Sequence, residues 1–178
     1  MDVWIFGYGS LIWRPGFDFE ESEFATLNGW HRSFQQASPD HRGTQEAPGR
    51  VLTITQAAGT RCIGKVFRVS AGEWPTVLRY LEVRESGGYE ALQVEVTSAR
   101  GNLLAWTWVA SSENRHFVKS ETFEKTIEVM LSAEGESGLN LDYVLNLDTA
   151  LNEAGIIDEE VSRFASELRM RISEASSD

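Results

Sequence analysis

The feature that most constrains the fold is a change in hydrophobic periodicity near residue 118. Before it, short segments rich in β-branched and aromatic residues predict strands. After it, apolar residues recur at three- and four-residue spacing, which predicts helices. The predicted strands cover residues 2–6, 50–56, 62–69, 92–97 and 103–110. Strands first and helices later favour an α+β protein with a closed or strongly curved sheet that helices partly cover.

One predicted helix interrupts the strand series. Four apolar residues share one face of this helix: Trp74, Val77, Leu78 and Leu81. Pro75 falls near its start, where a missing N–H does little harm. The later helices are expected around residues 123–131, 141–151 and 161–172. Asp158 is the expected N-cap of the last of these, and a frayed tail is expected from about residue 173.

Length and composition indicate one domain over residues 1–178. The chain has 178 residues, of which 42% are apolar, and this suits a single core. No run of about eighteen apolar residues and no leader pattern occurs, so we expect a soluble, cytoplasmic protein without a membrane partner. The single cysteine, Cys62, excludes an internal disulfide and is interpreted as a small core residue.

The charge distribution argues against nucleic acid as a partner. The formal net charge is -11, and residues 1–110 carry 10 basic and 12 acidic side chains, against 6 and 15 in residues 111–178. A nucleic-acid binder needs a basic face, and neither half supplies one. The histidines at positions 31, 41 and 116 lack metal-ligand spacing, so no metal site is expected.

The first candidate site is the turn in "VWIFGYGSLIW", where Gly7 and Gly9 follow a buried strand. Two glycines with a small hydroxyl residue, Ser10, allow a tight turn whose consecutive N–H groups can face an anion. The glycine spacing of a dinucleotide-binding turn is absent, and so is that of a serine nucleophile elbow. The alternative is a turn that only connects two strands.

A second candidate is the polar loop "SPDHRGTQEAPGR", residues 38–50. It concentrates His41, Arg42 and Arg50 in an acidic chain, and arginine can hold a carboxylate through two parallel hydrogen bonds. The same composition also suits a surface connector whose charges are solvated.

Glu85, in "LEVRESGGYE", is the third candidate. It lies in the last turn of the predicted helix, before Gly87 and Gly88, which give a flexible helix stop. The negative end of the helix dipole, together with burial, would raise the pKa of Glu85 toward the range of a general base. Glu82 neighbours it on the helix, whereas Arg84 is expected to point elsewhere. The alternative is a solvated glutamate.

Four motifs together resemble the ChaC-like branch of the γ-glutamylcyclotransferases. They are "FGYGSLIW", "DHRGT" with "PGR", "YLEVRESGGYE" and "SGLNLDYVLNL", and their order and spacing match from residue 3 to about residue 150. The resemblance implies a small mixed β-barrel with flanking helices and a reaction without a cofactor. In that reaction the substrate's α-amino group attacks its own γ-carbonyl and releases 5-oxoproline. The expected substrate for this branch is glutathione, which gives 5-oxoproline and Cys-Gly.

The resemblance also implies roles for individual residues. The family's catalytic glutamate falls on Glu85. Its glutamyl-binding loop falls on Tyr8, Gly9, Ser10 and Leu11. Tyr143 matches a tyrosine that the family places near the substrate, and Arg42 and Arg50 are candidate substrate contacts or loop organisers.

One departure from the family pattern leaves alternatives open. Residues 114–121 carry Phe117 where many relatives have tyrosine, and they lack a following Gly-Pro. A loop of this kind shapes the pocket beyond the γ-amide, so a cyclotransferase for other γ-glutamyl peptides or amines stays open. So do a non-catalytic module that binds a γ-glutamyl compound and an interaction protein whose acidic residues 111–178 meet a basic partner. A monomer and a homodimer are both compatible with the sequence.

Overall fold

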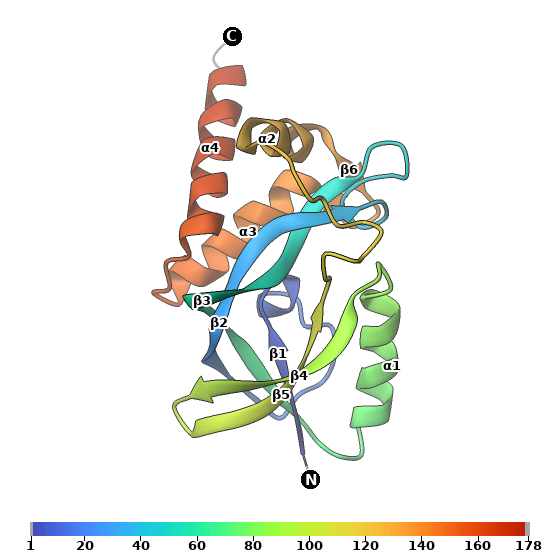
Figure 1. Ribbon diagram of the computed structural model, residues 1–178, viewed down its shortest axis with the longest axis vertical. Coiled ribbons are helices and arrows are strands. Elements are labelled where there is room, and N and C mark those ends of the chain that lie inside the picture. Colours follow the sequence, from blue (N-terminus) through green and yellow to red (C-terminus); the bar gives the residue numbers. More distant parts are fainter. Residues whose placement is uncertain (1, 177–178) are drawn as a thin grey trace. The chain divides into compact units, whose positions relative to one another are not determined.

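The computed structural model describes residues 2–176 and confirms the α+β class (Figure 1). In chain order the elements are β1 (Val3–Gly7), the 3-10 helix η1 (Ser10–Ile12), β2 (Glu21–Ser38), β3 (Gly49–Val69), α1 (Trp74–Arg84), β4 (Glu90–Ser98), β5 (Gly101–Val109), α2 (Phe123–Ser132), β6 (Glu134–Gly135), β7 (Gly138–Leu139), α3 (Asn140–Glu153) and α4 (Glu159–Ala175). Of the tail expected from about residue 173, positions up to Ala175 are helical, and residues 177–178 lie outside the described residues.

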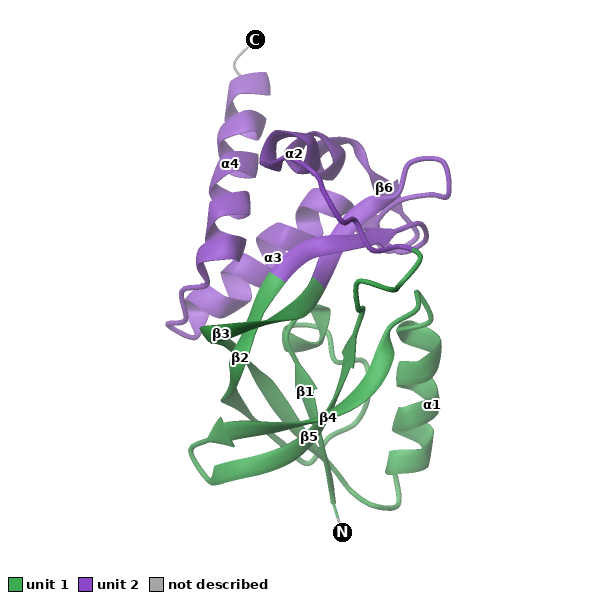
Figure 2. Cartoon of the chain, viewed as in Figure 1, with its two compact units in different colours: residues 1–32, 53–115 green, residues 33–52, 116–178 purple. Residues whose placement is uncertain are grey.

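The chain divides into two compact units, shown in different colours in Figure 2. Unit 1 comprises residues 1–32 and 53–115, and unit 2 comprises residues 33–52 and 116–178. The boundaries fall inside β2 and β3, so each of these strands contributes residues to both units. A single domain over the whole chain stays a prediction.

The five longer strands form a closed barrel in the order β1-β3-β2-β4-β5. Strand β1 runs antiparallel to β3, with Val3 opposite Val69, and parallel to β5, with Trp4 opposite Ala105. The β4–β5 pair is antiparallel and places Glu90 opposite Val109. The barrel closes through a short antiparallel contact between β2 and β4, with Ala25 opposite Ser98. The small mixed barrel that the sequence resemblance implied is therefore confirmed.

The structure differs from the predicted strands at two places. Strand β2, of 18 residues, was not predicted, because its polar residues interrupt the alternation expected of a half-buried strand. Its strand conformation comes from pairing with β3 and β4. The two segments predicted at 50–56 and 62–69 form one strand, β3. Between them lies Gly59, whose φ of +80 is a backbone conformation that favours glycine.

The core of unit 1 lies where α1 packs on the barrel. Its buried members are Ile5, Leu11, Phe67, Val69, Val77, Leu81 and Trp108. Val77 and Leu81 come from the predicted apolar face of α1, and fully burying side chains of this size contributes about 1.5–3 kcal/mol each. Cys62 is also buried, as expected of a core residue. This packing fixes the position of the end of α1 on the barrel, and therefore the position of Glu85.

Unit 2 holds the three helices predicted after residue 118. Their buried apolar faces consist of Ile127 and Met130 from α2, Val144, Leu147 and Leu151 from α3, and Val161, Phe164 and Leu168 from α4. Asp158 caps α4 as predicted, because its Oδ1 accepts a hydrogen bond from the Val161 N–H at 3.1 Å. None of the helices within residues 2–176 has the length and apolar character needed to cross a membrane.

Candidate active site

The turn after β1 is a short, internally bonded structure. The Gly9 carbonyl accepts a hydrogen bond from the Ile12 N–H at 3.0 Å, and the Ser10 carbonyl accepts one from the Arg14 N–H at 2.8 Å. Leu11 points into the core of unit 1. A Cβ at Gly7 would lie 2.6 Å from the Leu11 Cβ, so glycine is required there. The apolar anchor at Leu11 thus closes the turn tightly against β1.

Tyr8 is held at both its side chain and its backbone. Its hydroxyl donates to the Trp108 carbonyl at 2.7 Å, and its own carbonyl accepts from Arg32 Nε at 2.8 Å. The Arg32 guanidinium also donates to the Ile63 carbonyl at 2.6 Å, and the whole residue is only 2% exposed. Charge-assisted hydrogen bonds of a buried arginine are strong, so the backbone at Tyr8 is fixed in position.

Glu85 is the C-cap of α1. Its N–H donates to the Leu81 carbonyl at 2.8 Å, and its backbone leaves the helical conformation at φ -96 and ψ 21. Its side chain is 20% exposed, and its Oε1 lies 3.6 Å from Arg84 Nε. The carboxylate is thus partly buried beside a cation, at the end of a helix that is packed against the barrel.

Arg84 joins the turn to the end of α1. Its Nη2 donates to Ser10 Oγ at 2.7 Å, while its Nη1 donates to the carbonyls of Arg14 and Pro15 at 2.8 and 2.9 Å. The prediction that Arg84 points away from Glu85 was wrong. Its partners in the turn lie about seventy positions earlier, so helix periodicity could not reveal them.

Asn114 holds the two glycines that follow the end of α1, Gly87 and Gly88. The Asn114 side-chain amide donates to the carbonyls of Gly87 and Gly88 at 3.1 and 2.7 Å. Gly88 has φ +85, a conformation that favours glycine. A Cβ at this position would also lie 2.7 Å from the Asn114 amide nitrogen. Asn114 opens the segment 114–121 that the sequence singled out, and here it fixes the chain that follows Glu85.

In unit 2, Arg42 and Tyr143 form a buried pair. The Arg42 guanidinium lies over the Tyr143 ring, 5.7 Å from its centroid, and Nη1 donates to the Leu139 carbonyl at 2.9 Å. The Tyr143 hydroxyl accepts a long hydrogen bond of 3.4 Å from the Leu52 N–H. Arg42 therefore ties the loop 38–50 to the start of α3 while covering one face of the tyrosine ring.

Arg50 binds a carboxylate through two hydrogen bonds, as its residue type suggested, and this carboxylate belongs to Glu121. Arg50 Nε and Nη2 each lie 2.8 Å from one oxygen of Glu121, and Nη1 donates to the carbonyls of Pro48 and Gly49 at 2.9 and 3.0 Å. Thr126 Oγ1 adds a third hydrogen bond to Glu121, at 2.9 Å. The hydrogen bonds from Arg50 chiefly hold the pKa of Glu121 below its usual value of 4.5.

Replacing Glu121 with glutamine is expected to lower the free energy of unfolding at pH 7 by about 2 kcal/mol, because it removes one charge of a largely buried, bidentate pair. The pKa of Glu121 is lower in the folded state, so its contribution is fully present above about pH 4.5 and is lost as the pH falls through the folded-state pKa. Urea unfolding at pH 7 and at lower pH should therefore show a shallower pH dependence for the variant. Glu113→Gln, at an exposed position, is the control.

The structure groups the predicted site residues by unit. Tyr8, Gly9, Ser10, Leu11 and Glu85 lie in unit 1, where Arg84 bridges the turn and the glutamate. Arg42, Arg50 and Tyr143 lie in unit 2. Across residues 2–176, no cluster of three His, Cys, Asp or Glu side chains that could hold a metal ion is found.

Sequence reasoning missed two residues that hold the predicted site residues in place, Arg32 and Glu121. It also missed that Arg84 bridges the turn and Glu85. Arg32 gives no local signal, because its carbonyl partners lie 24 and 31 positions away. Glu121 is likewise 71 positions from Arg50. Asn114 and Glu121 both fall in the segment 114–121 that the sequence singled out, although their hydrogen-bond partners could not be read from it.

Comparison with known proteins gives consistent results. A family model described as "ChaC-like protein" matches residues 3–171. The γ-glutamylcyclotransferase 2-3 of Arabidopsis thaliana is 34% identical over 184 residues, covering 98% of this chain and 92% of the relative. The glutathione-specific γ-glutamylcyclotransferase 1 of Homo sapiens is 35% identical over 150 residues, covering 82% of this chain and 68% of the relative.

Solved structures share the fold. A crystal structure of a yeast γ-glutamylcyclotransferase specific to glutathione matches with a TM-score of 0.88 and 27% identity, covering 95% of this chain and 96% of the yeast chain. Another γ-glutamylcyclotransferase structure matches with a TM-score of 0.57 at 18% identity, which supports the fold alone. The barrel with flanking helices is thus the fold of these enzymes.

Proposed function

Because the chain belongs to the ChaC-like family, we propose that it is a γ-glutamylcyclotransferase that acts on glutathione. The observation that carries this proposal is its likeness, over most of its length, to relatives whose names specify that activity, in human and in yeast. In the reaction, the α-amino nitrogen of the glutamyl group forms a bond to its own γ-carbonyl carbon. The γ-amide C–N bond breaks, and 5-oxoproline and Cys-Gly leave.

Glu85 is the proposed general base and acid. An α-amino group is largely protonated near neutral pH, so the nucleophile must lose a proton and the leaving amine must gain one. A partly buried carboxylate at the end of α1, joined through Arg84 to the turn after β1, suits this exchange. Since the attack is intramolecular, holding the glutamyl group in a ring-closing conformation contributes much of the rate enhancement.

The turn formed by Tyr8, Gly9, Ser10 and Leu11 is the proposed glutamyl-binding loop. Its rigid backbone is suited to binding the α-carboxylate through N–H groups and to polarising the γ-carbonyl.

Unit 2 supplies the remaining proposed residues. Tyr143 contacts the substrate through its hydroxyl. Arg42 and Arg50 organise the loop 38–50, a role supported by their hydrogen bonds to Leu139, Pro48 and Gly49 carbonyls and to Glu121. The protein works without a cofactor, as a monomer or homodimer. The single cysteine, Cys62, fits the reducing cytoplasm.

The test is to incubate the purified protein with glutathione and to measure 5-oxoproline and Cys-Gly by mass spectrometry. Equal amounts of the two products are expected. The α-linked isomer of glutathione is the matched control, because its α-amide lacks the spacing that closes the same ring. Turnover only of other γ-glutamyl peptides or amines would contradict the glutathione assignment and favour an altered leaving-group pocket near residues 114–121. No turnover of any γ-glutamyl compound would favour a binding module.

Arg84→Gln is expected to reduce kcat/KM for glutathione about tenfold, because it removes charge-assisted hydrogen bonds that hold the turn at Ser10. Steady-state kinetics measures this loss. Arg79→Gln, at an exposed position of the same helix, removes an equal charge and should leave kcat/KM unchanged. Wild-type kinetics in Arg84→Gln would mean that the turn keeps its position without Arg84.

A further inference from the structure

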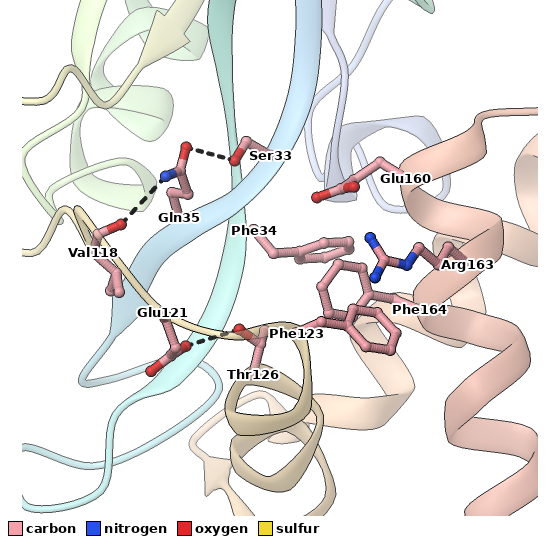
Figure 3. A pocket seen from close by; sticks show the side chains of 10 residues that line it. All are labelled: Ser33, Phe34, Gln35, Val118, Glu121, Phe123, Thr126, Glu160, Arg163 and Phe164. Atoms are coloured by element: carbon pink, nitrogen blue, oxygen red, sulfur yellow. Dashed lines mark hydrogen bonds between the residues drawn. The ribbon is translucent and has the colours of Figure 1, made fainter.

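A cavity of about 300 Å³, open to solvent on one side, lies within unit 2, among β2, the start of α2 and α4 (Figure 3). The residues proposed for catalysis and for binding the glutamyl group do not line it, although Val118 and Glu121 of the segment 114–121 do. This volume is at the lower end of the range for small-molecule sites, so the cavity suits a ligand the size of an amino acid or a dipeptide.

Aromatic side chains form the apolar wall of the cavity. The ring centroids of Phe34 and Phe164 are 4.8 Å apart, and those of Phe123 and Phe164 are 4.6 Å apart. Phe34 and Phe164 are buried residues, so the wall is held by the core of unit 2. Such a surface gains from contact with an apolar group of a ligand.

Two oppositely charged side chains from the first turns of α4 face this wall. In Figure 3 the carboxylate of Glu160 and the guanidinium of Arg163 both extend toward the cavity beside Phe34. The guanidinium stacks on Phe123, with its carbon 3.9 Å from the ring centroid. Within residues 2–176, no hydrogen bond or ion pair joins either charged side chain to another residue.

The other polar groups of the cavity are already used within the protein. Glu121 accepts hydrogen bonds from Arg50 and Thr126. The Gln35 amide accepts from Ser33 Oγ at 2.7 Å and donates to the Val118 carbonyl at 3.4 Å. Among the residues described at this cavity, Glu160 and Arg163 are therefore the charged groups that remain for a ligand.

The environment of Glu160 favours a cationic neighbour. Burial chiefly raises the pKa of this carboxyl, and the charge of Asp158 adds to the effect, whereas Arg163 opposes it. A positively charged ligand group in contact with Glu160 would offset the cost of burying its charge.

We propose that this cavity binds a small zwitterion, a free amino acid or a dipeptide with an apolar side chain. Its ammonium group contacts Glu160, its carboxylate contacts Arg163, and its side chain packs on Phe34 and Phe164. A guanidinium stacked on a ring keeps its edge N–H groups available for a bidentate carboxylate, which is the geometry that this assignment uses.

The test is calorimetric titration of the full-length protein with L-leucine and with leucylglycine. Neither probe contains a γ-glutamyl group, so the result does not depend on whether glutathione is a substrate. Saturable binding of at least one probe is expected. The probe that binds more tightly shows whether the cavity prefers a single amino acid or a dipeptide. N-acetyl-leucine and leucinamide each lack one charge and are expected to bind about tenfold more weakly or worse.

Charge-removing variants locate the site. Glu160→Gln and Arg163→Gln are each expected to weaken binding about tenfold, while Glu159→Gln and Arg79→Gln remove the same charges at exposed positions and should not. Far-UV circular dichroism confirms that the helices are kept. Failure of both probes to saturate would overturn the proposal. So would equal binding of the single-charge analogues, or unchanged affinity in both cavity variants.

Discussion

Replacing Glu85 with glutamine is expected to reduce the formation of 5-oxoproline from glutathione by about a hundredfold to ten-thousandfold, the usual contribution of general acid–base catalysis. Glutamine has nearly the shape of glutamate, so the contact with Arg84 and the end of α1 should be kept. It cannot take a proton from the α-amino group or return one to the leaving amine. The loss should therefore appear in kcat, measured by mass spectrometry of 5-oxoproline under saturating glutathione.

Glu82→Gln is the matched control for this experiment. Glu82 is an exposed acid on the same helix, so its replacement changes the net charge equally and should leave kcat at the wild-type value. Near-normal turnover in Glu85→Gln, with Glu82→Gln also active, would show that another group moves the protons. The likeness to the family would then still hold, because it does not depend on the role of this residue.

Replacing Arg32 with leucine is expected to lower the free energy of unfolding by about 3 kcal/mol, because one buried and one partly buried carbonyl lose charged hydrogen-bond donors. These carbonyls belong to Tyr8 and Ile63, at 2.8 and 2.6 Å from the guanidinium. Urea unfolding measures the change. Because the Tyr8 carbonyl belongs to the proposed glutamyl-binding loop, kcat/KM for glutathione should fall as well, at temperatures where the variant remains folded.

Arg61→Leu provides the comparison for Arg32→Leu. Arg61 is exposed on β3, so the same change of residue type should alter the free energy of unfolding by about 0.5 kcal/mol or less. If Arg32→Leu unfolded at the same urea concentration as the wild type, the hydrogen bonds of Arg32 would not hold the turn. Arg32→Lys keeps the charge but has fewer hydrogen-bond donors. Its free energy of unfolding is therefore expected to lie between those of Arg32→Leu and the wild type.

Elements with strong periodicity were predicted well. The helices expected at 123–131, 141–151 and 161–172 correspond to α2, α3 and α4, and the strands expected at 92–97 and 103–110 correspond to β4 and β5. These segments place their apolar residues on one face, so local spacing carries the information. Strand β2 was missed because its polar residues follow no alternation, and its pairing with β3 and β4 comes from tertiary structure.

The candidate site was predicted in part. Sequence motifs named Glu85 and the turn at residues 8–11, and the structure joins them within unit 1 through Arg84. The direction of Arg84 was predicted wrongly, because helix spacing says which residues neighbour each other on α1 and nothing about the loop beside its end. Arg50 was recognised as a carboxylate ligand by its residue type, but its partner, Glu121, became visible only in the fold.

By itself, the sequence determined the α+β class, the helices after residue 118, the family and the residues that carry its motifs, because each of these depends on local spacing or on short motifs in order. Only the tertiary structure decided which partners the buried charges take. Arg32 donates hydrogen bonds to the carbonyls of Tyr8 and Ile63, and Arg50 donates to Glu121. The cavity at Glu160 is lined by segments that are distant along the chain. Such contacts depend on how strands and helices pack, and no local pattern records them.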